Sequence, residues 1–519
     1  MTFLTFLSCL LLLSDITLTY SASGVKVNVG RSCRDSVEVT AQGSHVNIDS
    51  RIESHQLTIR LSGQNEDGGL MLRSRARVLL QLHDLSLQSR EGAVLSLKNH
   101  KKVEIQAMRG TRNSLTIVAC QDTAQHHAAA IWSRDKLKFS GRGELSVLAL
   151  GDGCKGIRAK DDVTIEDLTL SVETRGDNLG RDERPPFGGA QGPPFGEAQR
   201  PPFGEAQGPP FGEAPEDGFR GDHMPDFDMG DMPEDFPFPP DGEGFAPPLF
   251  PGMPGGEHEG GEPPFGGAQG QPFGMPMSGD PDETFRGGFK QRYVSPAKAL
   301  KSDGTITIRS GHVSCRTASA GAEGIEGKKG VVIQGGTVTV DAIDDAINAN
   351  GQIQFLGGTT VAQSHGNDAV DANMYGRSRQ PGIVVSGGSV SAWSHVGAPE
   401  EGMDCDFSPI EVSGGTLFTI GAGMGDMPSV PTSETAHQPT LLLVGLDLQR
   451  DDELTLMEEG RAILRMTVPF TFRGSNTLLS SPSLKTGHTY TLKTGQTQRE
   501  FLLRDNFTIV RRLTMVNEE

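Results

Sequence analysis

A repeat of about 22 residues in the second half of the chain constrains its fold more than any other feature. In each copy, a small apolar pair such as Ala346-Ile347 comes before two polar residues, a short strand, a turn that often contains Gly-Gly, and a second strand. A unit of this length cannot bury its apolar side chains alone, so successive copies must stack and share one continuous core. The sequence therefore predicts an all-β, right-handed parallel β-helix, in which matched residues of successive copies lie one above another. The copies begin at Cys154, Ala297, Ala322, Asp344, Asn367 and Glu400.

The remaining folded parts of the chain are predicted from alternation of apolar and polar residues. Runs such as VKVNV and QLTIRL predict N-terminal coils over residues 24–177. The repeats predict C-terminal coils over residues 293–425, and the copy at Cys154 is expected immediately before the copy at Ala297. Runs such as AILRMTVPF predict a small β cap over residues 440–519, which would cover the strand edges at the end of the stack.

Residues 178–292 have a different composition. An octapeptide recurs there, as PPFGGAQG from Pro185 and PPFGEAQG from Pro201. Because Pro removes backbone donors and Gly raises chain entropy, this stretch is predicted to be a long disordered, acidic insertion. A second interpretation is a Phe/Pro tract that contacts a cell wall or a partner. The chain has a net charge of -19, most of it in this stretch, and no basic stripe, which argues against nucleic acid as a partner.

The first 23 residues are predicted to be a signal peptide. Residues Phe3 to Leu13 are nearly all apolar, too short a run for a membrane span but typical of a signal-peptide core. Small residues favour cleavage between Ser21 and Ser23, and a buried first helix is the alternative. We therefore expect a secreted protein with no transmembrane segment, and a monomer.

The cysteines argue against zinc binding and against a dense disulfide framework. Cys9 lies in the predicted signal peptide, and the other five are far apart without a CxxC pair. They leave room for one disulfide.

Polar residues occupy matched positions in three successive copies, and stacking would align their side chains at one corner. Hard cations such as Ca²⁺ bind about six to eight oxygen ligands, and carboxylates packed this densely do not all stay ionised without a cation. The scarcity of Cys and His at these positions argues against zinc. We therefore expect a grid of calcium ligands formed by Asp344, Asp345, Asn348, Asn350, Asp368, Asp371, Asn373, Glu401, Asp404 and Asp406.

Two alternatives bear on this grid. Asp and Asn at solenoid corners are often only turn residues, but acidic residues in three consecutive copies favour calcium. Earlier copies place basic residues in the same columns, which suits either an anionic sugar chain lying across the face or salt bridges between copies. Those earlier residues are Lys155, Arg158, Lys160, Lys298 and Lys301, with Glu323 and Glu326 standing between them and the grid.

Candidate sugar contacts lie near the grid. Trp393 either offers a ring for sugar stacking or packs in the core, since it alternates with core-facing residues. His365 and His395 are interpreted as corner residues rather than as catalysts. The candidate sugar-binding residues are Tyr375, Arg377, Arg379, Trp393, Lys298 and Lys301.

Several motifs occur in an order that resembles a known family. They are GAVLSLKNHKKVEIQAMRGTRNSLTI, AAIWSRDKLKFSGRGELSV, GIRAKDDVTIEDLTL, DDAINANG, NDAVDAN, SGGTLFTIGAG and ILRMTVPFTFRGSNTLLSSPSLKTGHTYTLKTG. The chain resembles bacterial secreted carbohydrate-binding domain-containing proteins, which are calcium-binding parallel β-helices with a pectate-lyase-like fold. Three departures, GIEGKK, MYGRSRQPG and CDFSP, leave the exact ligand assignments open.

The resemblance implies non-catalytic binding of a cell-wall polysaccharide, either pectate-like or a cellulosic glucan. Calcium could bridge protein carboxylates to uronate carboxylates without a deep pocket. A calcium-dependent pectate lyase is one alternative, with Arg377, Arg379 or Lys301 as the base. A structural adhesin, in which calcium only staples the solenoid, is another.

Overall fold

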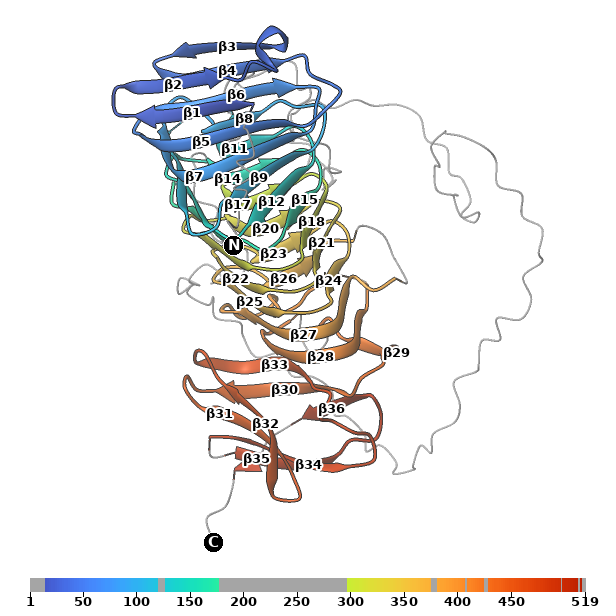
Figure 1. The fold of residues 1–519 in the computed structure, drawn as a ribbon. Coiled ribbons are helices and arrows are strands. Elements are labelled where there is room, and N and C mark those ends of the chain that lie inside the picture. Colours follow the sequence, from blue (N-terminus) through green and yellow to red (C-terminus); the bar gives the residue numbers. More distant parts are fainter. Residues whose placement is uncertain are drawn as a thin grey trace, which may run out of the picture. The chain divides into compact units, whose positions relative to one another are not determined.

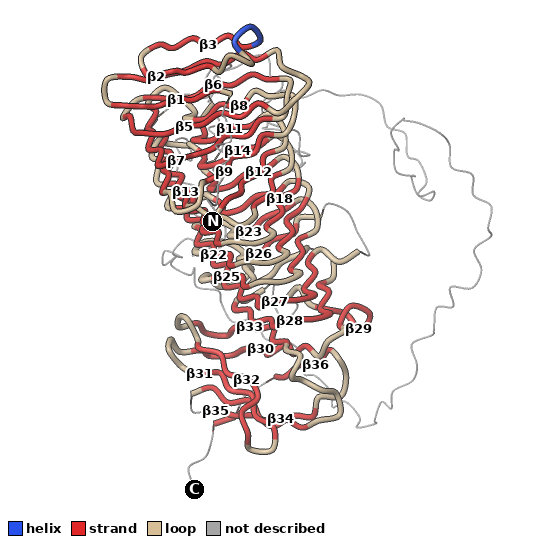
Figure 2. Tube along the Cα trace, in the orientation of Figure 1, coloured by secondary structure: helices blue, strands red, loops and turns tan. Residues whose placement is uncertain are grey.

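The computed structural model describes residues 15–119, 127–176, 296–374, 380–406, 408–423, 428–495, 497–511 and 514–515. These residues belong to one compact unit. Apart from one turn of 3-10 helix, η1 (Arg34–Ser36), the regular structure described is all β (Figures 1 and 2). The predicted insertion lies outside the described residues.

The strands stack as the coils of a parallel β-helix. In one coil β20 (Glu323–Gly327) is followed by β21 (Gly330–Ile333) and β22 (Thr337–Ala342), and each pairs in parallel with the matching strand of the next coil. The register places Ile325 beside Ile347 and Val331 beside Ile353. The all-β parallel helix predicted from the repeat is thus confirmed.

Three faces run along the stack. The first face contains β3 (Val37–Gln42), β4 (Ser44–Ser50), β6 (Gly68–Ser74), β8 (Leu95–Leu97), β11 (Ala129–Ser133), β14 (Lys155–Ala159), β17 (Lys298–Ser302), β20, β23 (Ile347–Ala349) and β26 (Val370–Ala372). The second contains β9 (Val103–Ala107), β12 (Leu137–Gly141), β15 (Val163–Ile165), β18 (Thr305–Ile308), β21 and β24 (Ile353–Phe355). The third contains β10 (Arg112–Ile117), β13 (Glu144–Ala149), β16 (Thr169–Thr174), β19 (His312–Thr317), β22 and β25 (Thr359–Ser364). Four longer strands run along two faces: β5 (Leu57–Asn65), β7 (Val78–Ser89), β27 (Ile383–Ser394) and β28 (Ile410–Ile420).

The core is continuous along the coils. Inward-facing apolar side chains from Ile16 to Leu478 form one buried cluster. Phe139 and Phe355 are among its largest fully buried side chains. At about 25 cal/mol for each Å² of apolar surface buried, this shared core is the main stabilising term.

A column of glycines makes one corner. A Cβ at Gly336 would lie 2.5 Å from the carbonyl oxygen of Gly311, and φ is positive there. Only glycine combines that conformation with such close stacking. The column, with the φ of each residue, is Gly311 (91°), Gly336 (83°), Gly358 (80°), Gly388 (78°) and Gly415 (78°).

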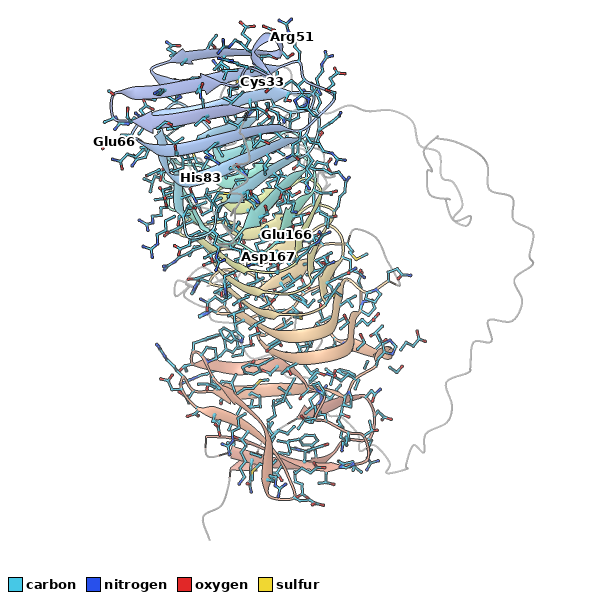
Figure 3. All side chains as sticks on the ribbon, viewed as in Figure 1. Cys33, Arg51, Glu66, His83, Glu166 and Asp167 are labelled. Carbon is cyan, nitrogen blue, oxygen red and sulfur yellow. The ribbon has the colours of Figure 1, made fainter. Side chains whose placement is uncertain are left out.

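Charged side chains on the outside of the second face pair between coils. Lys138 of β12 lies 3.5 Å from Glu104 and also contacts Glu166, which is labelled in Figure 3. Arg309 lies 3.3 Å from the other carboxylate oxygen of Glu166. Lys138 accordingly holds the pKa of Glu166 below its usual range. Here each carboxylate has a nearby cation.

The strands on either side of the insertion belong to consecutive coils. Ile157 of β14 pairs with Leu300 of β17, and Thr169 of β16 pairs with His312 of β19. This confirms the expected position of the Cys154 copy immediately before the Ala297 copy.

Replacing residues 177–295 with a short linker is therefore expected to leave the coils intact. The next equivalent connection, from β19 to β20, needs only residues 318–322, and no described strand pairing involves the deleted residues. Closing a shorter loop costs less chain entropy. We expect an unchanged circular dichroism spectrum and a thermal midpoint within a few degrees of the full chain. Loss of cooperative unfolding would contradict this.

The folded part begins earlier than predicted. β1 (Ile16–Ser21) pairs in antiparallel fashion with β2 (Gly24–Val29) and in parallel with β5. The side chains of Ile16, Leu18 and Tyr20 are buried in the core. Cleavage at residue 23 would remove this strand from the core, and the signal peptide stays a prediction.

The end of the stack continues into a second group of strands. β33 (Phe472–Ser480) pairs in antiparallel fashion with both β28 and β30 (Thr440–Leu448), and the buried residues from Phe418 to Val510 form a second apolar cluster. No helix in the described ranges is long and apolar enough to cross a membrane. The strands are β29 (Pro431–Ala436), β30 (Thr440–Leu448), β31 (Glu453–Glu458), β32 (Arg461–Thr467), β33 (Phe472–Ser480), β34 (Thr489–Thr494), β35 (Thr497–Leu502), β36 (Phe507–Arg511) and β37 (Thr514–Met515).

No disulfide links the cysteines of the described ranges. Cys33, Cys154, Cys315 and Cys405 are all buried, and burial raises the pKa of Cys315 to about 12. They serve as small core side chains.

Candidate metal centre

The first face carries the predicted grid at its C-terminal end, in the predicted register. Backbone bonds from Ala346 N to Asp368 O and from Ala369 N to Glu401 O place Asp345, Asp368 and Glu401 in one column. Strand pairing places Asn348 beside Asp371, and a bridge joins Asp371 to Asp404. The repeat alignment thus gave the correct neighbours in both columns.

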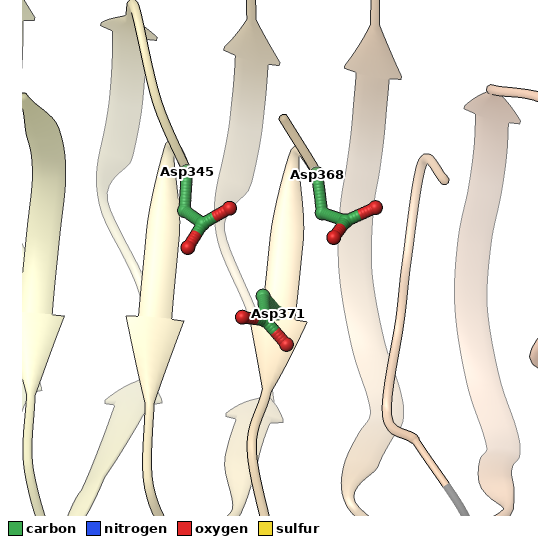
Figure 4. A group of neighbouring side chains, drawn as sticks. All are labelled: Asp345, Asp368 and Asp371. Carbon is green, nitrogen blue, oxygen red and sulfur yellow. The ribbon is translucent and has the colours of Figure 1, made fainter. Parts of the chain in front are cut away.

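Three carboxylates converge between two coils. Asp345 comes just before β23, while Asp368 comes just before β26 and Asp371 lies in it (Figure 4). One oxygen from each lies within 4.8 Å of the other two. The three residues are only 3%, 8% and 7% exposed, respectively. Oxygen atoms at such separations can bind one hard cation between them.

Amides and backbone N–H groups satisfy part of this cluster. Asn348 Nδ2 donates to Asp345 Oδ2 at 2.6 Å and approaches Asp371 Oδ2 at 3.4 Å. Asn373 also donates to Asp371, and the N–H of Glu401 donates to Asp368 Oδ1 at 2.5 Å. Asp345 Oδ1 is buried and has no hydrogen-bond partner among the described residues. A buried acceptor of this kind is costly unless something binds it.

Burial dominates the electrostatics of the cluster. Desolvation raises the pKa of Asp371 to about 9, and Asp345 and Asp404 add to the shift. It also raises the pKa of Asp345 and of Asp368 well above the usual range. Without a cation, Asp371 therefore favours its protonated form at neutral pH, whereas a bound divalent cation would favour the ionised forms of all three carboxyl groups.

Glu401 extends the cluster toward the last coil. Burial and the neighbouring Asp404 raise the pKa of Glu401 to about 8. The N–H of Ser429 donates to Glu401 Oε2 and its hydroxyl to Asp404 Oδ1, both at 2.8 Å. Ser429 was not among the predicted residues. It follows the last repeat, so the alignment of repeats could not show that the fold brings it beside the carboxylates.

The third predicted column lies farther out. Asn350 and Asp406 are exposed, and the N–H of Asp406 donates to Asp404 Oδ1 at 3.0 Å. Asn373 acts through its bond to Asp371. Asp344 is half-buried and adds negative charge beside Asp345. The converging group is therefore smaller than the ten residues predicted.

In the two preceding coils, lysines and glutamates occupy the same columns and neutralise each other's charge. Lys298 contacts Glu323 and lies 3.0 Å from Glu326, while Lys301 lies 3.1 Å from the same Glu326 oxygen. Burial alone would lower the pKa of Lys298, but the two glutamates raise it. Of the two interpretations of these lysines, the geometry fits salt bridges between coils, and their ammonium groups are too buried to serve as open sugar contacts.

The remaining candidates do not form a sugar platform. Trp393 is half-buried and packs against the C-terminal apolar cluster, as in the core-packing alternative. The ring of His395 stacks on that of Phe470, with 3.8 Å between the ring centroids, and its centroid lies 4.4 Å from that of His365. Burial and the neighbouring His365 lower the pKa of His395 to about 4, so its ring is neutral at pH 7. Tyr375, Arg377 and Arg379 lie outside the described residues.

The fold and the site together define a class of protein: a β-solenoid with a cluster of buried carboxylates on one face. Residues 42–184 and 294–372 match the model of the family described as carbohydrate-binding domain-containing protein. This match bears out the predicted resemblance to that family over these residues.

No curated protein matches the chain. Among solved structures, "Structure of the polysaccharide lyase-like protein from C. thermocellum, Gadolinium derivative" is similar at 13% identity and a TM-score of 0.35, covering 80% of this chain and 100% of that chain.

Proposed function

We propose that the protein is a secreted, calcium-dependent and non-catalytic binder of an acidic cell-wall polysaccharide. Asp345, Asp368 and Asp371 would hold the ion, with Glu401 beside them. Bound calcium supplies a positive charge that can be shared between these carboxylates and the uronate carboxylates of a sugar chain. The family match supports the polysaccharide as partner.

One observation carries the calcium proposal: along the first face, the buried glutamates of one coil are paired with lysines, whereas, among the described residues, the buried aspartates of the next two coils are not. Glu323 and Glu326 are neutralised by Lys298 and Lys301. No described ammonium or guanidinium group forms an ion pair with the three aspartates of the next two coils. Buried carboxylates need compensation, and converging oxygens fit calcium better than the softer metals.

Calcium-dependent depletion onto insoluble polygalacturonate tests this function. At physiological salt, where exposed charge contacts are screened, we expect the protein to leave the supernatant in calcium and to remain there in chelator, with no growth of the absorbance of unsaturated uronates. Asp371→Asn should lose the calcium-dependent part, because the cluster then has one fewer charged oxygen ligand, while the exposed control Asp505→Asn, far from the first face, should not.

The other outcomes of this experiment would favour one of the alternative functions. Growing absorbance would make the protein a lyase. Depletion that is equal in calcium and chelator would leave calcium without a role in binding, and no depletion at all would leave it as a structural staple of an adhesin.

A further inference from the structure

A second charged column runs along the edge of the first face, where its strands end. Arg73, Lys98, Arg134 and Lys160 occupy the same position in four successive coils. Backbone bonds from Lys98 N to Leu72 O, Arg134 N to Leu97 O and Lys160 N to Ser133 O fix this register. Neighbouring strands lie about 4.8 Å apart, so the column presents one cation at each such step.

The middle of this column has no neutralising partner. Neither Lys98 nor Arg134 forms an ion pair with another described residue. At the two ends, Arg73 lies 4.0 Å from Asp49, and Lys160 lies 3.1 Å from Asp303. Burial and the adjacent Arg73 lower the pKa of Lys98, which is the sign expected for crowded like charges.

The acidic residues that follow in the sequence are engaged with the backbone. Asp135 Oδ1 accepts the N–H of Lys136, and Asp161 Oδ1 accepts the N–H of Asp162, each at 2.7 Å. Next to them, Lys136 lies 2.8 Å from Asp162. Asp135 and Asp161 keep their negative charge, but their carboxylates are turned to the backbone and form no ion pair with the cations of the column.

We propose that Arg73, Lys98, Arg134 and Lys160 form a binding track for a linear polyuronate, laid along the axis of the coils. A chain along the axis meets one cation at each coil, whereas a chain across the face would meet only one. This inference rests on the proposed polysaccharide-binding function, but the track needs no metal.

The track also leads to the calcium grid. The same position is occupied by Asp303 and Lys328 in the next two coils, then by Asn350 and Asn373, as the bonds from Asp303 N to Ala159 O and from Asn373 N to Ala349 O show. A long polyuronate would meet direct cations at one end and the proposed calcium ions at the other.

Affinity electrophoresis of the full chain through gels containing polygalacturonate, run in chelator, tests the track. We expect the protein to be retarded in low salt and the retardation to fall as salt rises. The double variant Lys98→Gln/Arg134→Gln should bind roughly 3- to 30-fold more weakly, because two charge contacts are lost. The control Arg473→Gln/Lys493→Gln, which makes the same charge change on the C-terminal strands, should bind as the unaltered chain does.

Oligogalacturonates of increasing length add a geometric test. Their affinity in chelator should rise with each sugar up to about four or five charged units, the length of a four-coil track. Equal binding by the two double variants, equal retardation by a neutral glucan, or no retardation in chelator would each overturn the track. None of these results would alter the calcium-dependent depletion or its loss in Asp371→Asn, so the two proposals can fail separately.

Discussion

In chelator, the free energy of unfolding is expected to fall as the pH rises from about 5 to about 9, and saturating calcium is expected to abolish this fall. The pKa of Asp371 is raised to about 9 from an ordinary value of 3.8, and that of Glu401 to about 8 from 4.5. Between the ordinary and raised values the folded chain holds protons that the unfolded chain has released. The contribution of these carboxyl groups to stability is therefore greatest at the low end of this window and decreases as the pH rises through it.

The expected effect is large because several groups contribute. Each carboxyl group with a raised pKa can contribute up to about 1.4 kcal/mol for each pH unit, so the slope in chelator should be at least about 1 kcal/mol per pH unit. Calcium replaces the protons, and at a hundredfold excess over its dissociation constant it should add about 2.7 kcal/mol. Urea unfolding at several pH values, with calcium or chelator, measures both quantities.

Matched variants separate the cluster from the rest of the surface. Asp371→Asn should lose most of the calcium stabilisation and have a shallower pH slope in chelator, because it removes one titrating group. Asp49→Asn changes an exposed carboxylate and should leave both unchanged. Parallel curves in calcium and chelator at every pH would contradict the metal centre.

The columns of the candidate site were predictable because the repeat fixes the register. Once Ile325 and Ile347 were aligned as core residues, Asp345 had to stack under Asp368, and Asn348 beside Asp371. Alignment does not reveal which polar residues converge and which face water. Asn350 and Asp406 share the alignment but are exposed, because they lie where the chain turns away from the face.

Two features could not be predicted from the sequence and became clear only from the structure. The strand β1 was not predicted, because the small residues that follow it favoured a signal peptide, while Ile16, Leu18 and Tyr20 alternate as core-facing residues. The roles of Lys298 and Lys301 stayed open because identical positions suit a sugar contact or an internal ion pair, and only burial separates the two.

Lys298→Met is expected to be the most destabilising single substitution on the first face, at about 3–5 kcal/mol. It leaves Glu323 without its ammonium partner in a buried site, where burial already raises the pKa of that carboxyl. The control Lys160→Met breaks a more exposed pair with Asp303 and should cost at most about 1 kcal/mol.

A second substitution shows whether the cost comes from the stranded charge. Lys298→Met/Glu323→Gln removes the uncompensated carboxylate as well, so it should recover a large part of the lost free energy in chelator. Urea unfolding of the three variants measures the differences. If Lys298→Met were as mild as Lys160→Met, water would reach this network and the lysines would be free to meet a ligand. If it is severe and the double variant recovers, the ammonium groups act as built-in cations for two coils, which leaves the next two coils to be neutralised from solution.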